Sequence, residues 1–190
     1  WRSRSASSSL SFIWRRESWK DGRVSKKIER NYLEINSLND LKETRLTQNG
    51  FSFEKVEPEN FKINKFFYKN VGKKHHWVDR LVWTDKNWID YTTDNKVKTF
   101  IVKKHDDLVG YFELIHHEEQ NEVEIAYLGL LEEYHNKKIG SFLLSTAIKN
   151  AFLEKPQRVW VHTCSLDHKN ALRNYIARGM KIFKKETVFV

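Results

Sequence analysis

Residues 122–144 constrain the fold of this chain most strongly, because their hydropathy pattern changes twice within one short segment. Apolar and polar residues alternate from Glu122 to Leu130, which is the period of a β-strand. A polar and basic stretch follows, and apolar residues return with helical spacing after Gly140. The segment therefore predicts a strand, a loop and a helix in direct succession. Free backbone N–H groups at such a helix start favour an anion such as a pyrophosphate.

We name residues 135–141 the phosphate loop. Its backbone N–H groups and the positive end of the helix dipole would point at one spot. Gly140 allows either the close approach of a phosphate or a positive φ, and Lys137 and Lys138 add positive charge beside it. The residues expected to contact an anion are His135, Asn136, Lys137, Lys138, Ile139, Gly140 and Ser141.

The strand before the phosphate loop is expected to have one packed face and one face open to chemistry. Strict alternation places on one face Val123, Ile125 and Tyr127. It places on the other face Glu122, Glu124, Ala126 and Leu128. A glutamate on this second face could serve as a general base.

Two motifs in the chain resemble those of the GNAT superfamily of acyl-CoA-dependent N-acetyltransferases. The family signature Arg/Gln-x-x-Gly-x-Gly/Ala corresponds to residues 135–140, with His135 in place of Arg or Gln and Lys138 in place of the first glycine. The later pattern Ala-x-x-x-Tyr-x-x-x-Gly-Phe corresponds to Ala171, Tyr175, Gly179 and Met180. Residues 68–80 and 159–168 further resemble a bacterial subgroup of this family, and the whole resemblance covers roughly residues 30–190.

The resemblance implies that acetyl-CoA binds as a co-substrate between the fourth and fifth strands of the fold. Its pantetheine amides would pair with the backbone of Leu128, Gly129 and Leu130, and its pyrophosphate would lie on the phosphate loop. The resemblance also implies direct acetyl transfer, in a ternary complex, to a primary amine of a small molecule or peptide. Because His135 and Lys138 depart from the signature, a non-catalytic CoA-binding protein is the alternative within the family.

Acetyl transfer needs a base, since an amine is mostly protonated near neutral pH and must lose a proton before it attacks. The resemblance implies Glu124, at the spacing before Leu130 found for the catalytic glutamate of the histone-acetylating branch. Glu122, Glu113 and a water molecule are the alternative bases. A solvated Glu124 on the polar strand face is the purely structural alternative.

The leaving thiolate needs a proton donor, and Tyr175 is the candidate acid. A phenol with a reference pKa of about 10 can pass a proton to a thiolate whose conjugate acid has a reference pKa of about 8.5. A tyrosine that only packs is the alternative, because one helical face also carries Ala171, Leu172, Ile176 and Gly179.

The acceptor amine is expected near residues 66–91, which are rich in aromatic side chains and cover the acceptor site in GNAT folds. Most of these rings would belong to the core. Trp77, however, lies in a loop after Gly72, where no helical pattern requires it. Trp77 is therefore expected to line the acceptor pocket, and Asp79 to hold an ammonium group.

The remaining side chains of reactive types are expected to have structural roles. Cys164 is expected to be a small buried thiol, with covalent acyl transfer through it as the alternative. Asp167 is expected to cap the last helix rather than to join Ser165 and His168 in a catalytic triad. His162 and the adjacent histidine pairs form no recognisable ligand set, so no metal is expected.

The pattern of the whole chain predicts an α/β fold. Strands are expected at 32–35, 51–57, 96–103, 108–116, 122–130 and 158–164 and at the C-terminal end. Helices are expected at 38–43, 59–70 and 84–91, after Gly140 and from Asp167 onward. The predicted architecture is a GNAT-like mixed β-sheet with helices on both faces, in the order β-α-α-β-β-β-α-β-α-β.

Composition limits the class of protein and its compartment. A length of 190 residues fits one domain, and 39% hydrophobic residues exclude a disordered chain. The single cysteine favours a reducing cytoplasm, and no apolar run approaches the roughly 18 residues of a membrane-spanning helix. Residues 1–29 are expected to be a flexible Ser/Arg-rich tail, either a transit peptide or a non-native extension. Residues 30–190 would form the acetyltransferase domain, as a monomer or homodimer.

The net charge of +9 suits a polyanionic cofactor, a nucleic acid or an anionic surface. Part of this charge lies in the Ser/Arg-rich tail. A basic nucleic-acid-binding module, with tryptophans that stack on bases, is therefore the alternative from another functional class. Under the acetyltransferase hypothesis the partner is an amine, and neither a nucleic acid nor a membrane.

Overall fold

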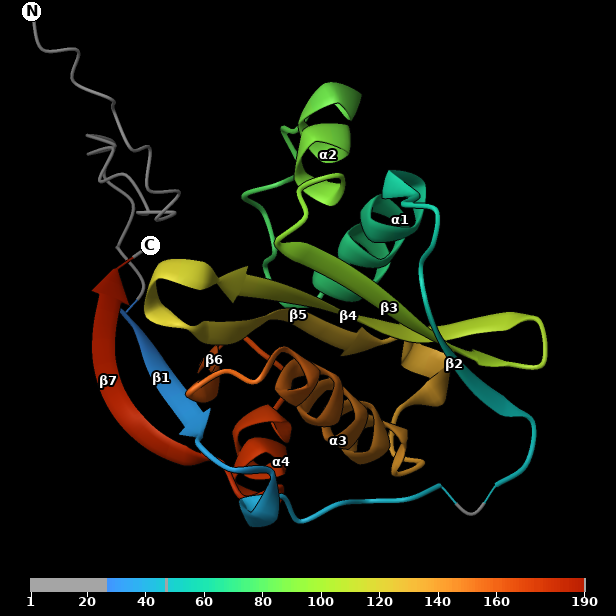
Figure 1. The fold of residues 1–190 in the computed structure, drawn as a ribbon. Helices are drawn as coiled ribbons and strands as arrows, with labels where there is room; N and C mark the ends of the chain where they lie inside the picture. Colours follow the sequence, from blue (N-terminus) through green and yellow to red (C-terminus); the bar gives the residue numbers. More distant parts are fainter. Residues whose placement is uncertain (1–26, 47, 190) are drawn as a thin grey trace, which may run out of the picture.

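The computed structural model describes residues 27–46 and 48–189, which form one seven-stranded sheet with the order β2-β3-β4-β5-β6-β1-β7 (Figure 1). The strands are β1 (Lys27–Ile35), β2 (Phe51–Lys55), β3 (Val97–Lys104), β4 (Asp107–His117), β5 (Glu122–Leu130), β6 (Arg158–Cys164) and β7 (Lys181–Phe189). The helices are α1 (Phe61–Gly72), α2 (Asp85–Thr92), α3 (Ile139–Ala151) and α4 (Ala171–Ala177). Among the described strands, β5 and β6 pair in parallel and the other neighbours pair antiparallel.

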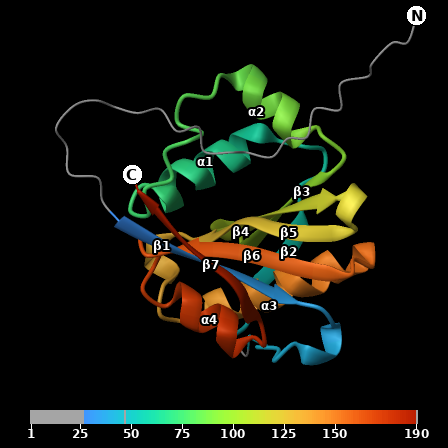
Figure 2. The same ribbon diagram turned by 90° about the vertical axis from the view of Figure 1, so that its left-hand side faces the viewer.

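Helices cover both faces of the sheet, as predicted. Figures 1 and 2 show α1 and α2 on one face and α3 and α4 on the other. The predicted α/β fold is therefore confirmed. The strands expected at 32–35 and 51–57 are present as β1 and β2, although the overall order predicted for the chain contains only one strand before its first helices. The helix expected at 38–43 is only a 3-10 turn at Leu38–Asp40, capped by Ser37. In the described part of the chain, no helix has both the length and the hydropathy needed to cross a membrane.

The first described strand includes part of the segment predicted to be a tail. β1 begins at Lys27, before the domain boundary expected at residue 30. The rest of the predicted tail, residues 1–26, lies outside the described residues.

The core lies mainly between the sheet and α3. This helix buries Ile139, Leu143, Leu144, Ala147, Ile148 and Ala151 against strand residues such as Val123 and Ile125. On the opposite face, α1 buries Phe67, whose ring stacks on that of Tyr111 at 4.7 Å between centroids. Stacked and offset rings of this kind add about 0.5–1.5 kcal/mol to the burial of their area. Side chains therefore pack against β5 on both faces of the sheet, which fixes its position.

β5 and β6 separate after a short paired stretch. They are in register only from Glu122 opposite Arg158 to Glu124 opposite Trp160. Beyond that point β5 stays paired with β4 as far as Leu130, while β6 stays paired with β1. No described strand pairs with the outer part of β5 on this side, so its backbone groups there are available to a ligand.

A β-bulge at Ala126 shifts the register between β5 and β4. Beyond the bulge, Tyr127 packs toward α1 and Leu128 packs with the core under α3. Because a bulge reverses the alternation of side chains, the predicted strand faces hold only before Ala126. The expected grouping of Tyr127 with Val123 is wrong: Tyr127 shares the face of Glu124, and Leu128 does not.

Gly179, at the end of α4, has a structural reason to be glycine. Its φ is +99°, and a Cβ there would lie 2.1 Å from the carbonyl oxygen of Asp40. The adjacent Arg178 carbonyl accepts a hydrogen bond from the Lys42 N–H at 3.0 Å. The chain after β1 is thus packed closely against the end of α4, which fixes the helix that carries Tyr175.

Candidate active site

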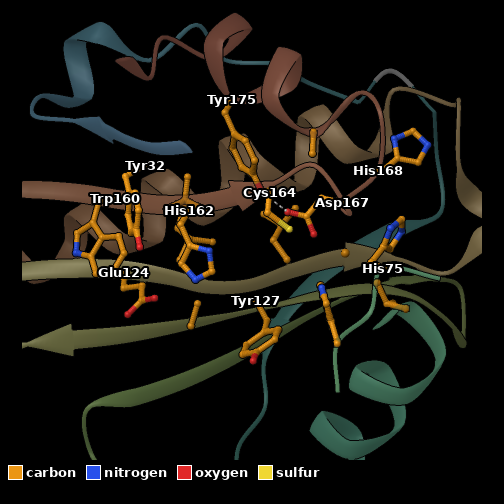
Figure 3. Close-up of a pocket in the computed structure, with 18 of the residues that line it drawn as sticks. Tyr32, His75, Glu124, Tyr127, Trp160, His162, Cys164, Asp167, His168 and Tyr175 are labelled. Carbon is orange, nitrogen blue, oxygen red and sulfur yellow. Dashed lines mark hydrogen bonds between the residues drawn. The ribbon is translucent and has the colours of Figure 1, made fainter. Parts of the chain in front are cut away.

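A cavity of about 1230 Å³ occupies the opening between β5 and β6. Figure 3 shows His75 and His168 at one end, Tyr175 and Cys164 in the middle, and Glu124, Trp160 and Tyr32 at the other end. Pockets for a single small ligand usually measure about 300–1,000 Å³. The cavity therefore has room for two substrates side by side.

The phosphate loop has its left-handed residues at unexpected positions. Lys138 is the N-cap of α3 with a φ of 61°, and Asn136 has a φ of 62°. Gly140 has no positive φ, so of the two alternatives expected for this glycine only the close approach of a phosphate remains. The left-handed position coincides with the first glycine of the family signature, and Lys138 accepts it at a cost of about 1 kcal/mol. Gly140 instead leaves open space, since a Cβ would contact only Leu130 Cδ1, at 3.6 Å.

Most side chains of the phosphate loop face the cavity. The lining includes His135, Asn136, Lys138, Gly140 and Ser141, together with Leu128, Gly129 and Leu130 of β5. Two predicted residues do not line it. Lys137 turns away, because its Nζ donates to the Glu133 carbonyl at 2.8 Å, and Ile139 is fully buried in the core.

Hydrogen bonds inside the phosphate loop define which backbone donors a ligand can reach. The N–H of His135 donates to the Glu132 carbonyl at 3.0 Å, and that of Ser141 to the Lys138 carbonyl at 3.2 Å. The donors for a phosphate therefore lie between these two residues. Nε2 of His135 is 3.2 Å from the Leu130 carbonyl oxygen, which ties the loop to the end of β5.

The start of α3 is joined directly to α4. Ser141 Oγ donates to Asn174 Oδ1 at 2.9 Å, and Asn174 Nδ2 donates to the Gly140 carbonyl at 3.2 Å. Tyr175 follows Asn174 in the chain, so these two hydrogen bonds hold the tyrosine at a fixed place relative to the phosphate loop.

Tyr175 points into the middle of the cavity, close to Cys164 (Figure 3). It is 8% exposed, and its hydroxyl has no hydrogen-bond partner among the described residues. Burial, and then the nearby carboxylate of Asp167, raise its pKa well above the ordinary value. The phenol is therefore protonated at neutral pH and suited to donate a hydrogen bond. Full proton transfer to a thiolate would be uphill, so hydrogen bonding to the developing charge is the better role for Tyr175.

The three candidate glutamates have different surroundings. Glu113 is fully buried, where it accepts from Arg80 at 2.9 Å, Tyr91 at 2.6 Å and Asn64 at 2.8 Å. Glu122 forms an ion pair with Arg158 at 2.7 Å. Only Glu124 lines the cavity, where its Oε2 lies 2.9 Å from Nε2 of His117.

The loop between α1 and α2 covers the cavity next to β5. Trp77 packs on Gly72, where a Cβ would lie 2.6 Å from the Cβ of Trp77, and its ring is 4.9 Å from that of Tyr127. Asp79 accepts hydrogen bonds from Tyr68 at 2.5 Å and from Tyr127 at 3.2 Å. Both predicted acceptor residues therefore line the cavity, and Asp79 is held by two phenols.

The model of the acetyltransferase (GNAT) family matches residues 58–180 of this chain. The chain belongs to the GNAT family. A comparison with curated proteins finds no match.

Solved structures of low sequence identity share the GNAT fold with this chain. A GCN5-related N-acetyltransferase from Sphaerobacter thermophilus matches with a TM-score of 0.66 and 13% identity, over 87% of this chain and 53% of that one. The corresponding protein from Kribbella flavida has a TM-score of 0.60 and 15% identity, over 85% of this chain and 56% of that one. This GNAT chain thus spans little more than half the length of these structures.

A shorter neighbour is also similar. An aminoglycoside acetyltransferase from an uncultured soil metagenomic sample, in complex with trehalose, has a TM-score of 0.59 and 13% identity. The match covers 70% of this GNAT chain and 90% of that one.

The GNAT cavity also contains residues that the sequence analysis did not assign to it. These residues are Tyr127, Trp160 and Tyr32. Strict alternation placed Tyr127 on the packed face, because the sequence does not reveal the bulge at Ala126. Alternation along residues 158–164 could have identified Trp160, because it shares the exposed strand face with His162. The ring of His162 is reached through the cavity, yet the surrounding protein removes it from bulk water, and this burial lowers its pKa. His162 is thus neutral at pH 7.

Two further expectations need correction. Asp167 does not cap α4: its Oδ2 accepts from Thr163 Oγ1 at 2.7 Å and from the Cys164 N–H at 2.8 Å, so it closes the turn after β6. Cys164 is only half-buried and lines the cavity, but burial still raises the pKa of its thiol. A protonated thiol is a poor nucleophile. Among the described residues no cluster of His, Cys, Asp and Glu has the size of a metal site.

Proposed function

We propose that this protein transfers an acetyl group from acetyl-CoA to a primary amine of a small molecule or peptide, by direct attack in a ternary complex. One observation carries the proposal: a single cavity joins the phosphate loop, the free edge of β5, Tyr175 and Glu124. Direct transfer needs a thioester and an amine in one enclosed space. The resemblance to a bacterial GNAT subgroup, a cytoplasmic location and a monomeric or homodimeric state belong to the same proposal.

The part of the cavity beside the phosphate loop offers groups that can bind CoA. The free backbone edge at Leu128–Leu130 can pair with pantetheine amides, and the N–H groups between His135 and Ser141 can bind a pyrophosphate. Lys138 adds a positive charge on the lining. A CoA-binding protein without catalysis would keep these features and would lack only turnover.

The chemistry requires one proton acceptor and two hydrogen-bond donors. Glu124 takes the proton of the ammonium group, and the free amine attacks the thioester carbonyl. A backbone N–H near Leu130 stabilises the oxyanion. When the C–S bond breaks, Tyr175 donates a hydrogen bond to the thiolate, and the thiolate takes up the second proton lost by the attacking nitrogen. A water molecule that passes the proton to Glu124 is compatible with the same geometry.

The acceptor is proposed to bind beside Trp77 and Asp79, where aromatic rings and a carboxylate suit an ammonium group. The structural neighbours described as aminoglycoside acetyltransferases, one of them in complex with sisomicin, support a small-molecule amine.

Replacing Trp77 with Ala should raise the KM for the amine at least about fivefold, because the substitution removes an aromatic wall. The Kd for acetyl-CoA, measured by calorimetry, should not change. Val82→Ala is the matched control, since Val82 lies in the same loop and is 84% exposed. An unaltered KM in a folded Trp77→Ala protein would place the acceptor elsewhere.

The proposal is tested against the nucleic-acid-binding alternative by thermal unfolding of the whole chain. Acetyl-CoA should raise the Tm in proportion to the logarithm of its concentration. Nucleic acid should bind weakly, if at all. A Tm that acetyl-CoA leaves unchanged, together with salt-sensitive binding of nucleic acid, would favour the alternative.

A further inference from the structure

His117, the last residue of β4, makes a specific contact with Glu124. Its Nε2 lies 2.9 Å from Glu124 Oε2, and both residues line the cavity. The His117 ring also stacks on Trp160, with centroids 5.8 Å apart and an interplanar angle of 22°. The imidazole is therefore held in place by a carboxylate and by an indole.

The partner of Glu124 differs from those of the neighbouring glutamates. Glu122 pairs with Arg158, and Glu118 lies 3.9 Å from Lys96. Among the described residues, Glu124 has no lysine or arginine within ion-pair distance. A lysine or arginine would compete with the amine proton for the carboxylate, whereas the ring N–H of a histidine can orient a carboxylate through a single hydrogen bond.

The two side chains also differ in their access to solvent. The side chain of His117 is 32% exposed and that of Glu124 is 15% exposed. The hydrogen bond thus joins a carboxylate inside the cavity to a residue at its edge. Tyr32 closes the same end, with its ring 6.4 Å from Trp160 and 5.8 Å from His162.

We propose that His117 is a positioning residue for proton transfer to Glu124, an inference that rests on the proposed function. Nε2–H of His117 donates to Oε2 and so turns Oε1 toward the amine. The N–H bond of the ammonium breaks, an O–H bond forms at Oε1, and the proton leaves to solvent when Glu124 is ionised again. The second proton lost by the attacking nitrogen passes to the leaving thiolate, so each turnover releases the acetylated amine, the CoA thiol and one proton.

Two substitutions at one site separate this role from a packing role. His117→Phe keeps a flat ring on Trp160 but removes the hydrogen bond, so kcat should fall about 10-fold with little change in the Kd for acetyl-CoA. His117→Gln restores an amide donor near the position of Nε2, so kcat should return to within about 3-fold of the unmodified protein. His105→Gln, in the exposed turn between β3 and β4, is the control and should leave kcat unchanged.

A double-mutant cycle shows whether His117 acts through Glu124. Adding His117→Phe to Glu124→Gln should lower kcat by less than about 2-fold further, because the base has already been lost. If Glu124→Gln is slow while His117→Phe has full kcat, the inference about His117 is wrong and the proposed base stands. If Glu124→Gln itself keeps full kcat, the proposed base is wrong.

A measurement without an amine tests the contact directly. Nitrogen-15 NMR of histidine-labelled protein at neutral pH reports which ring nitrogen of His117 carries the proton. We expect the Nε2–H tautomer in the unmodified protein and a different tautomer ratio in Glu124→Leu. The same ratio in both proteins would overturn the proposed hydrogen bond.

Discussion

Replacing Tyr175 with Phe should lower the turnover of acetyl-CoA with an amine about 10- to 1000-fold, while the Kd for acetyl-CoA stays the same. The substitution removes only the hydroxyl that points into the cavity, next to Cys164. That hydroxyl makes no hydrogen bond to a described residue, so its loss leaves no protein group unsatisfied. The effect should therefore appear in kcat and not in the Tm.

The chain offers a close control for this substitution. Tyr111 is also fully buried, and its hydroxyl has no partner among the described residues, but it lies in the core against Phe67 rather than on the cavity. Tyr111→Phe should keep full turnover. Equal kcat values for Tyr175→Phe and the unmodified protein would remove Tyr175 from the mechanism and leave it a packing residue.

Replacing Gly140 with Glu should weaken acetyl-CoA binding at least about 100-fold, because a carboxylate would enter the site of the pyrophosphate. The protein itself should tolerate a side chain here, since among the described residues outside its own helix turn a Cβ would contact only Leu130 Cδ1, at 3.6 Å. Calorimetric titration with acetyl-CoA gives the affinity, and circular dichroism gives the fold.

Gly140→Ala separates crowding from charge at the same position. A methyl group makes an ordinary contact with Leu130, so this variant should fold and bind acetyl-CoA within about 10-fold of the unmodified protein. If Gly140→Glu folds and binds acetyl-CoA as tightly as Gly140→Ala, the pyrophosphate does not lie on the phosphate loop.

The sequence predicted best those structural features that depend on residues close together in the chain. The change of period around the phosphate loop predicted β5, a loop and α3, and the structure contains all three in that order. The helix expected at 84–91 is present as α2, and the side chain of its N-cap residue Thr84 accepts from the Asn87 N–H in a capping box. Such features depend on residues close together in the chain, which a single sequence records well.

Features set by distant contacts were not predictable in this way. The bulge at Ala126 depends on the pairing of β5 with β4, and it moves Tyr127 to the cavity face. The ion pair of Arg80 with Glu113 joins the loop after α1 to the middle of β4, and it removes Glu113 from the candidate bases. Neither the register nor that pairing leaves a periodic signal in the sequence.

The sequence predicted the location of the phosphate loop but not its backbone conformation. Its location followed from the strand-loop-helix pattern, but the left-handed residues are Asn136 and Lys138 and not Gly140. Propensity favours glycine at such a position, and the tertiary structure overrides that preference. A sequence in which one glycine of the signature is replaced therefore still forms the loop.

Release of the CoA thiol in the presence of different primary amines tests the central claim most directly. The whole protein is incubated with acetyl-CoA and a panel of small-molecule and peptide amines. Free thiol is measured by absorbance with a thiol reagent, and the masses of the products are determined by mass spectrometry. The account predicts that at least one amine accelerates thiol release and gains a single acetyl group, and that Tyr175→Phe slows both. Acetyl-CoA binding without any amine-dependent thiol release would contradict the proposed acetyltransferase and indicate a CoA-binding protein without catalysis.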